Sequence, residues 1–255
     1  MAPSLRRFYV DRVFSRVGEI LELSPRETFH LHRVLRLKAG DHCRIFNRQG
    51  FGAEARIETI SKEKGAELLL QNVFQLSEKS LPLKVAQAIP QRKKMDELVD
   101  RAEELGVHEL WVVETRRSMV RMRREAAERA RNRWERISVE AAKQSGNPVL
   151  MKIEGPLPFE KAVQEKIEPG DRGFIFHPDP TGISFQEMMV CLKQTGKEVM
   201  PSPVVFFFGP EGGFTEGEVH LAQSCGVRKV FLGHSILRLE TAFLGVISAV
   251  RFLVS

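Results

Sequence analysis

The sequence has few cysteines and no long hydrophobic run. Its three cysteines, Cys43, Cys191 and Cys225, are scattered without a C-x-x-C pair, which excludes a disulfide framework or a zinc site of that spacing and favours a reducing cytoplasm. The longest apolar stretch, residues 242–250, is about half the ~20 residues that a membrane-spanning helix needs. The N-terminal residues include arginines but no apolar segment typical of a signal peptide. We therefore expect a cytoplasmic protein without a membrane segment.

Positive charge is concentrated in one stretch of the chain. The formal net charge is +6, and between Arg116 and Arg136 nine arginines stand against three glutamates, so this stretch alone carries the whole excess. A concentrated basic segment is typical of proteins that bind the phosphate backbone of nucleic acids. The alternative is a solvated helix with i,i+4 pairs such as Glu125–Arg129. The excess of arginine favours nucleic acid.

Residues 1–73 are predicted to form a small β-rich domain. Polar and apolar residues alternate at His42–Asn47 and Ala53–Ile60, a turn at Gly50 separates the two runs, and a further run follows at Glu67–Phe74. A small barrel that carries basic residues is typical of an RNA-docking module. A plain structural domain accounts for the same pattern equally well.

One short helix is expected inside this domain. Ser24 is predicted as its N-cap, Pro25 as its first residue and Glu27 as the partner that completes a capping box. The helix should continue to about Leu35.

The polar, proline-terminated segment Gln75–Pro82 is the predicted domain boundary, and beyond it residues 81–255 alternate between strand and helix patterns. The expected strands are Leu83–Ile89, Glu109–Val113, Arg172–Phe176, Val204–Phe208 and Lys229–Leu232. The expected helices are Lys93–Leu105, the arginine-rich stretch up to about Gly146, Ser184–Lys193 and Thr241–Ser255. This alternation predicts an α/β domain whose parallel sheet has helices on both faces.

Two glycine-bearing stretches, Phe208–Glu218 and Leu232–Ala242, each follow a predicted strand and precede a predicted helix. Turns with little side-chain bulk place bare backbone amides at the carboxyl ends of adjacent strands, where open α/β sheets bind ligands. We interpret them as the walls of one cofactor pocket suited to an adenine-like edge and a ribose. Neither matches a nucleoside-triphosphate loop or a G-x-G-x-x-G fingerprint. Thr215 and Glu218 are predicted to form a capping box.

Several motifs in the same order resemble those of the bacterial RsmE family, 16S ribosomal RNA methyltransferases that make 3-methyluridine and belong to the SPOUT class. The motifs are His32–Asp41, Glu103–Val107, Thr115–Ser118, Glu140–Gly146, Gly209–Gly213, Leu232–Gly233 and Ile236–Ala242. The resemblance covers most of the chain. It implies a PUA-like N-terminal barrel and a C-terminal trefoil-knotted domain whose last segment is threaded through a loop.

The resemblance also implies S-adenosylmethionine as the cofactor, held by three loops. The cofactor-binding residues expected on this basis are Phe176, His177, Pro178, Gly209, Pro210, Glu211, Gly212, Gly213, Leu232, Gly233, Ile236, Leu237, Arg238, Thr241 and Ala242. The last helix, apolar on nearly every side, is expected to form a two-fold homodimer interface.

Methylation of uridine N3 requires the ring to lose a proton, and the resulting charge spreads onto the flanking oxygens. A guanidinium beside them would stabilise this charge and lower the pKa of the base. Arg238 and Arg116 are the candidate catalytic stabilisers, and Glu240 is a candidate base. For both Glu211 and Glu240, however, a role in holding loop backbone is favoured. The expected contacts with 16S ribosomal RNA, free or in a small-subunit particle, are Arg6, Arg7, Arg33, Arg36, Arg116, Arg117, Gln144 and Asn147.

Two other functions are compatible with the sequence. The chain departs from the family pattern at Asn147 and Ser235, where a basic residue and an arginine are usual, so one alternative is a ribosome-assembly or RNA-binding factor without catalysis. The other is an α/β enzyme acting on a small anionic ligand. A non-catalytic factor should not bind S-adenosylmethionine, whereas the methyltransferase should. An enzyme acting on a small ligand should show no salt-dependent affinity for RNA.

Overall fold

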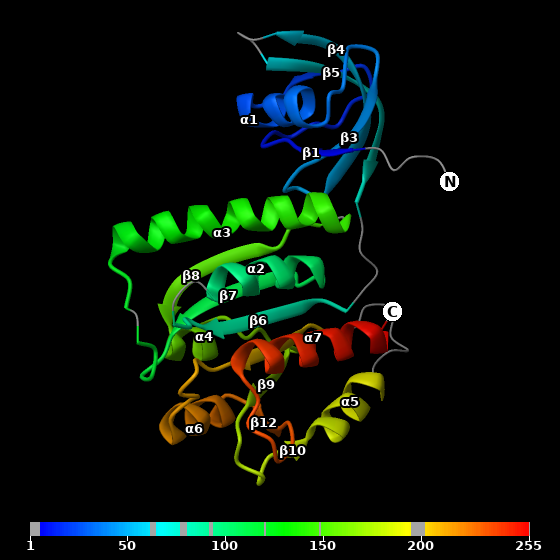
Figure 1. Ribbon diagram of the computed structural model, residues 1–255. Helices are drawn as coiled ribbons and strands as arrows, with labels where there is room; N and C mark the ends of the chain where they lie inside the picture. The colour runs from blue at the N-terminus through cyan, green and yellow to red at the C-terminus, as the bar shows by residue number, and fades with distance from the viewer. Residues whose placement is uncertain are drawn as a thin grey trace. The chain divides into compact units, whose positions relative to one another are not determined.

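The computed structural model describes residues 6–61, 65–76, 81–91, 94–119, 121–147, 149–194 and 202–254. By contact, the chain divides into two compact units, and Figure 1 colours the chain from its N-terminus to its C-terminus. The first unit comprises Met1–Glu78 and Ala142–Leu150, and the second comprises Lys79–Ala141 and Met151–Ser255. In the part of the chain that is described, no helix has the length and apolar character to cross a membrane.

The first unit is built on a five-stranded sheet with the order β1-β3-β4-β5-β2. Its strands are β1 (Arg7–Tyr9), β2 (Ile20–Glu22), β3 (His42–Phe46), β4 (Phe51–Ser61) and β5 (Gly65–Gln75). The predicted alternation is confirmed, because Cys43, Ile45, Ala55, Ile57 and Leu68 all point into one core. β1 pairs with β3 in parallel, whereas the other pairs are antiparallel.

The predicted short helix is present as α1 (Pro25–Phe29), followed by one π-helical turn, η1 (His30–Val34). Ser24 is the N-cap as expected, because its Oγ accepts a hydrogen bond from the Glu27 amide. The predicted capping box is wrong in its second half. The Glu27 carboxylate binds Lys143 Nζ at 2.9 Å, and both side chains are buried, so charge pairing takes the carboxylate away from the helix start.

The second unit contains a seven-stranded sheet in which every pair is parallel, with the order β10-β12-β9-β11-β6-β7-β8. Its strands are β6 (Leu83–Ala88), β7 (Glu109–Glu114), β8 (Lys152–Pro158), β9 (Arg172–Phe176), β10 (Ile183–Ser184), β11 (Val204–Phe208) and β12 (Arg228–Phe231). The predicted parallel sheet is confirmed. The sequence patterns missed β8 because Gly155, Pro156 and Pro158 are typical strand breakers, which an edge strand tolerates.

Helices cover both faces of this sheet, as predicted (Figure 1). Val204, Phe206 and Phe208 of β11 point to the face covered by four helices, and Val205 and Phe207 point to the face covered by two. The first group is α2 (Lys94–Glu104), α3 (Arg124–Ser145), α5 (Phe185–Gln194) and α7 (Leu239–Val254), and the second is α4 (Phe159–Glu165) and α6 (Glu216–Ser224). Each fully buried phenylalanine contributes roughly 1.5–3 kcal/mol, so β11 anchors both layers.

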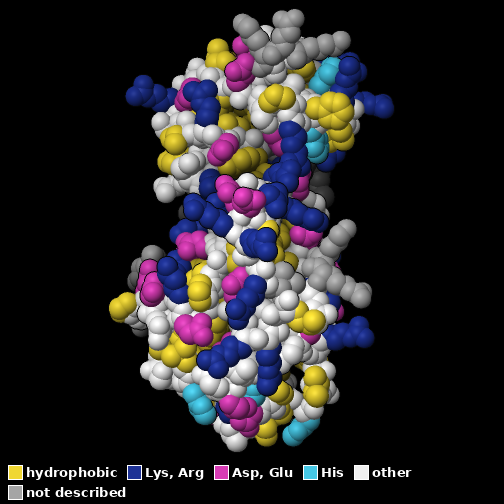
Figure 2. Space-filling view, turned by 90° about the vertical axis from the view of Figure 1, so that its left-hand side faces the viewer, with side chains coloured by type: hydrophobic (Ala, Val, Ile, Leu, Met, Phe, Trp, Pro, Cys, Tyr) yellow, Lys and Arg dark blue, Asp and Glu magenta, His cyan; other side chains and the backbone are white. Residues whose placement is uncertain are grey.

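The arginine-rich stretch is only partly helical. Arg116 and Arg117 lie in the connection before α3, which begins at Arg124, so the expectation of one helix through the whole stretch is corrected. Trp134 points into the core while Arg129 and Arg133 are exposed. Figure 2 shows basic side chains on this face of the molecule mixed with acidic ones. The threading of the last segment through a loop stays a prediction.

Burial makes the three free cysteines unequal. Cys43 lies in the core of the first unit, and burial raises the pKa of its thiol to about 12, whereas Cys191 and Cys225 are partly exposed. Because the thiolate is the reactive species, an aromatic disulfide reagent at pH 8 should modify two thiols of the native protein and the third only after unfolding in guanidinium. Cys43→Ala should leave the native count unchanged. Equal native reactivity of all three thiols would contradict the packing described for Cys43.

Candidate functional site

All seven strands of the second unit end at one edge of the sheet, because they run in parallel. Five of the connections that leave this edge start at residues 89, 115, 177, 209 and 232, after β6, β7, β9, β11 and β12. The two predicted glycine stretches are therefore on the same edge, but they do not follow adjacent strands. β9 lies between β11 and β12, so its loop at His177 separates them. The expectation that the two stretches follow adjacent strands is therefore corrected. The order of strands in a sheet is set by the crossover connections, which local sequence patterns do not reveal.

The loop after β11 is tightly folded upon itself. The Gly213 amide donates to the Pro210 carbonyl at 2.8 Å, and Gly213 has a φ of +69°, which favours glycine. A Cβ added to Gly209 would lie 3.1 Å from backbone atoms of Gly213. The glycines at 209 and 213 are thus needed for close approach and for the turn.

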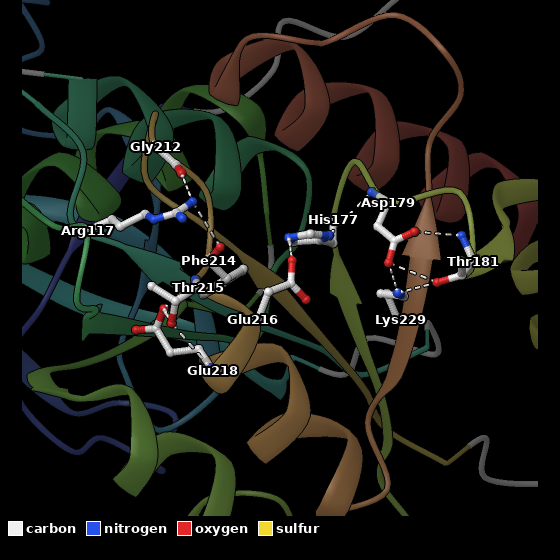
Figure 3. A network of polar contacts seen from close by, with 10 residues as sticks. All are labelled: Arg117, His177, Asp179, Thr181, Gly212, Phe214, Thr215, Glu216, Glu218 and Lys229. Atoms are coloured by element: carbon white, nitrogen blue, oxygen red, sulfur yellow. Dashed lines mark hydrogen bonds and ion pairs between the residues drawn. The ribbon is translucent and has the colours of Figure 1, made fainter.

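The predicted capping box at the start of α6 is confirmed. Thr215 Oγ1 accepts from the Glu218 amide, and the Glu218 carboxylate accepts from the Thr215 amide at 2.8 Å (Figure 3). The same buried carboxylate accepts from the Arg116 amide at 2.8 Å. One side chain therefore joins the loop after β7 to the loop after β11.

Arg117 also holds the loop after β11. Its Nη1 donates to the carbonyl oxygens of Gly212 at 2.8 Å and Phe214 at 3.2 Å, and Figure 3 shows the guanidinium lying against this loop. The sequence predicted Arg117 as an RNA contact, but the structure places its guanidinium on loop backbone. Arg116 exposes its side chain, and its backbone amide makes its one hydrogen bond to the residues that the structure describes.

A polar network fixes the loop after β9. The His177 amide donates to the Val230 carbonyl at 3.1 Å, His177 Nδ1 accepts from the Asp179 amide, and Nε2 lies 3.8 Å from Glu216 (Figure 3). Asp179 binds Lys229, which with the hydrogen bonds from Thr181 holds the pKa of that carboxyl well below its usual range. The loop is thereby tied to β12 and faces α6.

Two aromatic contacts pack the strand ends beneath these loops against each other and against the final helix. Phe176 stacks on Phe208 with ring centroids 4.7 Å apart, and Phe208 packs against Phe243 of α7. Pro178, the third residue predicted in this loop, is exposed. The ends of β9 and β11 and the final helix therefore form one packed base.

The loop after β12 exposes most of its side chains. Gly233 has a φ of +123°, and the Ile236 side chain is 92% exposed beside the exposed Leu237. The Arg238 guanidinium makes no hydrogen bond or ion pair with residues that the structure describes, and Leu232 is half-buried. Of the helical residues predicted here, Thr241 is exposed and Ala242 half-buried; the Ala242 amide donates to the Arg238 carbonyl.

Lys94 binds one carboxylate from each of the two glycine stretches. Its Nζ is 3.2 Å from Glu211 Oε1 and 3.3 Å from Glu240 Oε2. Burial alone would raise the pKa of Glu211, but amide donors, including that of Gln91, together with Lys94 lower it. The Glu240 pKa is also lowered, by its own amide and then by Lys94. A carboxylate with a lowered pKa is a weak base, so the geometry favours loop support over proton abstraction.

The predicted RNA contacts of the first unit fall into two groups. Arg7 donates to the carbonyl oxygens of Ala142 and Asn147 at 3.0 and 2.8 Å and stacks over Phe46, which satisfies the end of α3. Asn147 is buried, and its side chain accepts from the Val149 amide. The residues whose side chains are exposed are Arg6, Arg33, Arg36 and Gln144.

Sequence reasoning missed three polar residues that shape the site. Lys94 and Gln91 follow β6, and Gln87 at the end of β6 donates to the Ala88 carbonyl and lies 3.5 Å from the Gly209 carbonyl. The one available signal was the basic run before the helix that follows Ile89. No group of three metal-binding side chains occurs within the described ranges.

Comparison with known proteins identifies the class to which this fold and site belong. The family model of an RNA methyltransferase domain matches residues 77–251, and that of an RNA methyltransferase PUA domain matches residues 23–69. Because the first match covers more than half of the chain, the chain belongs to the RNA methyltransferase family.

Two curated relatives of this chain have the same name. Ribosomal RNA small subunit methyltransferase E from Synechocystis is 31% identical over 86% of this chain and 69% of its own length. The protein of the same name from Bacillus subtilis is 27% identical over 97% of this chain and 96% of its own length. The resemblance inferred from the motifs is thus confirmed.

Solved structures agree with the fold. A ribosomal RNA small subunit methyltransferase E from Neisseria gonorrhoeae, bound to S-adenosyl methionine, superposes with a TM-score of 0.81 at 28% identity over 98% of each chain. A putative methyltransferase from Legionella pneumophila, in complex with the same cofactor, superposes with a TM-score of 0.83 at 27% identity over 97% of each chain. Both the α/β fold and the PUA-like N-terminal domain are therefore confirmed.

Proposed function

We propose that this chain transfers a methyl group from S-adenosylmethionine to N3 of a uridine in 16S ribosomal RNA. The observation that supports this most is the convergence of the Phe176, Gly209–Gly213 and Leu232–Arg238 loops at one sheet edge, in a chain of the RNA methyltransferase family. The two glycine stretches are the segments on which the resemblance to the family depends.

The residues at this edge fit such a cofactor. The Gly209–Gly213 turn offers backbone groups without side-chain bulk, and Ile236 and Leu237 offer exposed apolar side chains for an adenine ring. We expect these two loops and the His177 loop to hold the cofactor. When bound, S-adenosylmethionine supplies an activated methyl group on its sulfonium.

The chain's own residues would prepare the uridine. Arg116 and Arg238 have exposed guanidinium groups in two of the five loops, where they can stabilise the negative charge on the uridine oxygens. Because this stabilisation lowers the pKa of N3, no dedicated base is required. Glu211 and Glu240 remain engaged with Lys94.

The target atom lies on the pairing edge of the base, so the substrate is unpaired or extruded RNA. We propose that Arg6, Arg33, Arg36 and Gln144 contact the RNA, with a salt dependence typical of phosphate contacts. We predict that the substrate is 16S ribosomal RNA, free or in a small-subunit particle, and that the protein is cytoplasmic.

Gly209→Ala tests the cofactor site. The added methyl group would crowd the Gly213 backbone at 3.1 Å, so the loop must shift, and affinity for S-adenosylhomocysteine measured by calorimetry should fall about tenfold. The amount of 3-methyluridine in 16S ribosomal RNA should fall together with this affinity. Mass spectrometry of the RNA from a complemented deletion strain measures it.

The matched control is Gly217→Ala, because no atom lies within 4 Å of a Cβ added there. This variant should bind and methylate as the wild type does. If the wild-type chain binds no S-adenosylhomocysteine, the proposal is overturned in favour of a non-catalytic RNA-binding factor. If it binds the cofactor but 3-methyluridine persists in the deletion strain, the assigned target base is wrong.

Arg238→Ala tests the proposed stabilisation of charge. Because the guanidinium makes no hydrogen bond or ion pair with other described residues, its loss should leave folding intact and lower the turnover rate at saturating cofactor by about 10²-fold. Single-turnover methylation of a ribosomal RNA fragment measures this rate. Arg228→Ala, at the first residue of β12 and so at the end of the strand opposite the loop, is the control. A rate within threefold of wild type would remove Arg238 from the catalytic group.

We also propose a homodimer that uses the final helix. Phe252 of α7 is 75% exposed although most of its apolar neighbours in the helix are buried, and a second copy would cover it. Light scattering at micromolar concentration should give twice the 29.0 kDa chain mass, and Phe252→Glu should shift the mass toward one chain. A wild-type mass of one chain would contradict the dimer.

A further inference from the structure

One ammonium group links two loops of the site that are far apart in sequence. Lys94 is the first residue of α2, and its Nζ binds Glu211 in the loop after β11 and Glu240 in the first turn of α7. The helices α2 and α7 pack side by side (Figure 1), and the ion pair joins the start of one helix to the first turn of the other.

The link through Lys94 has no direct substitute in the described part of the chain. No hydrogen bond there joins the residues 209–215 directly to the residues 232–238. Glu211 is held from a second side, because both of its oxygens accept from the Gln91 amide at 3.1 and 3.2 Å. Gln91 and Lys94 therefore hold the Glu211 loop together, and Lys94 extends this support to α7 through its ion pair with Glu240.

Two negative charges share one positive charge at this point. Glu211 and Glu240 approach the same cation, so removing that cation would leave two carboxylates facing each other. The hydrogen bond to Glu211, then that to Glu240, raise the pKa of Lys94, so the bound ammonium is harder to deprotonate than a free one. The three side chains are 26–36% exposed, where a single ion pair contributes little, but loss of the shared cation also adds repulsion.

We propose that Lys94 is a positioning residue that holds the Glu211 loop and the start of α7 at the spacing needed to bind the methyl donor. This inference depends on the proposed function of the site. Lys94 acts through the two carboxylates and not on the reacting atoms. It preassembles the walls of the pocket, which lowers the ordering cost of cofactor binding.

A role in preassembly gives a specific kinetic signature. Lys94→Met should weaken binding of S-adenosylhomocysteine about five- to tenfold and raise the KM for S-adenosylmethionine equally. The turnover rate at saturating cofactor should stay within twofold, because the chemical step does not use the ammonium. A general loss of folded protein would instead lower the turnover number and leave the KM unchanged.

Rescue variants isolate the electrostatic cause. Lys94→Arg keeps the charge and should restore affinity to within about threefold of wild type. In the Lys94→Met background, Glu240→Gln removes the repulsion and should recover part of the lost affinity, which a double-mutant cycle measures. Lys161→Met, at an exposed ion pair on α4, is the matched control and should bind as wild type does.

The experiment is calorimetric titration of the full-length variants with S-adenosylhomocysteine, with circular dichroism to establish folding. Absence of binding to the wild type would overturn the proposed function itself. Wild-type binding together with Lys94→Met affinity within twofold would overturn only the role of Lys94. If Lys94→Met does not fold, Glu240→Gln in the wild-type background replaces it: a loss of about threefold supports the link, and unchanged affinity overturns it.

Discussion

The parallel pairing of β11 with β6 on one side and β9 on the other is the constraint on which the site depends. Every residue of β11 is buried, so the strand is held between two helical layers by side chains that alternate from one face to the other. Because its neighbours run in the same direction, all their loops leave the sheet at one edge. Displacement of β11 would move the Gly209–Gly213 turn and separate it from the loops on either side.

Above this rigid base, charged side chains connect the loops. Glu218 joins the loop after β7 to the start of α6, and Arg117 returns from that loop to the Gly212 and Phe214 carbonyls. Lys94 makes the corresponding connection between Glu211 and α7. A pocket of bare backbone has few side chains of its own with which to hold its shape, so residues from neighbouring strands supply the contacts. Function and loop stability are therefore carried by different residues of the same edge.

The contacts that each arginine makes in the folded protein determine whether its guanidinium is available to bind RNA. Arg116 and Arg117 are adjacent in sequence and were both predicted to bind RNA, yet one exposes its guanidinium and the other binds loop carbonyls. Arg7 donates to the carbonyl groups of Ala142 and Asn147, which belong to the same unit of the chain. Carbonyl groups left open by a turn or a helix end attract the nearest guanidinium, and the sequence does not indicate which arginine will reach them.

The sequence by itself determined most of the local elements and the identity of the family. The apolar runs at Val204–Phe208 and Arg172–Phe176, the Thr215–Glu218 capping box and the Ser24 N-cap depend on contacts between near neighbours, which composition and spacing express. Only the tertiary structure decided that β9 lies between the two glycine loops, that Glu27 pairs with Lys143, and that Lys94 joins Glu211 to Glu240. Those arrangements result from crossovers and from pairing through space, which join residues whose separation along the chain carries no information about their distance.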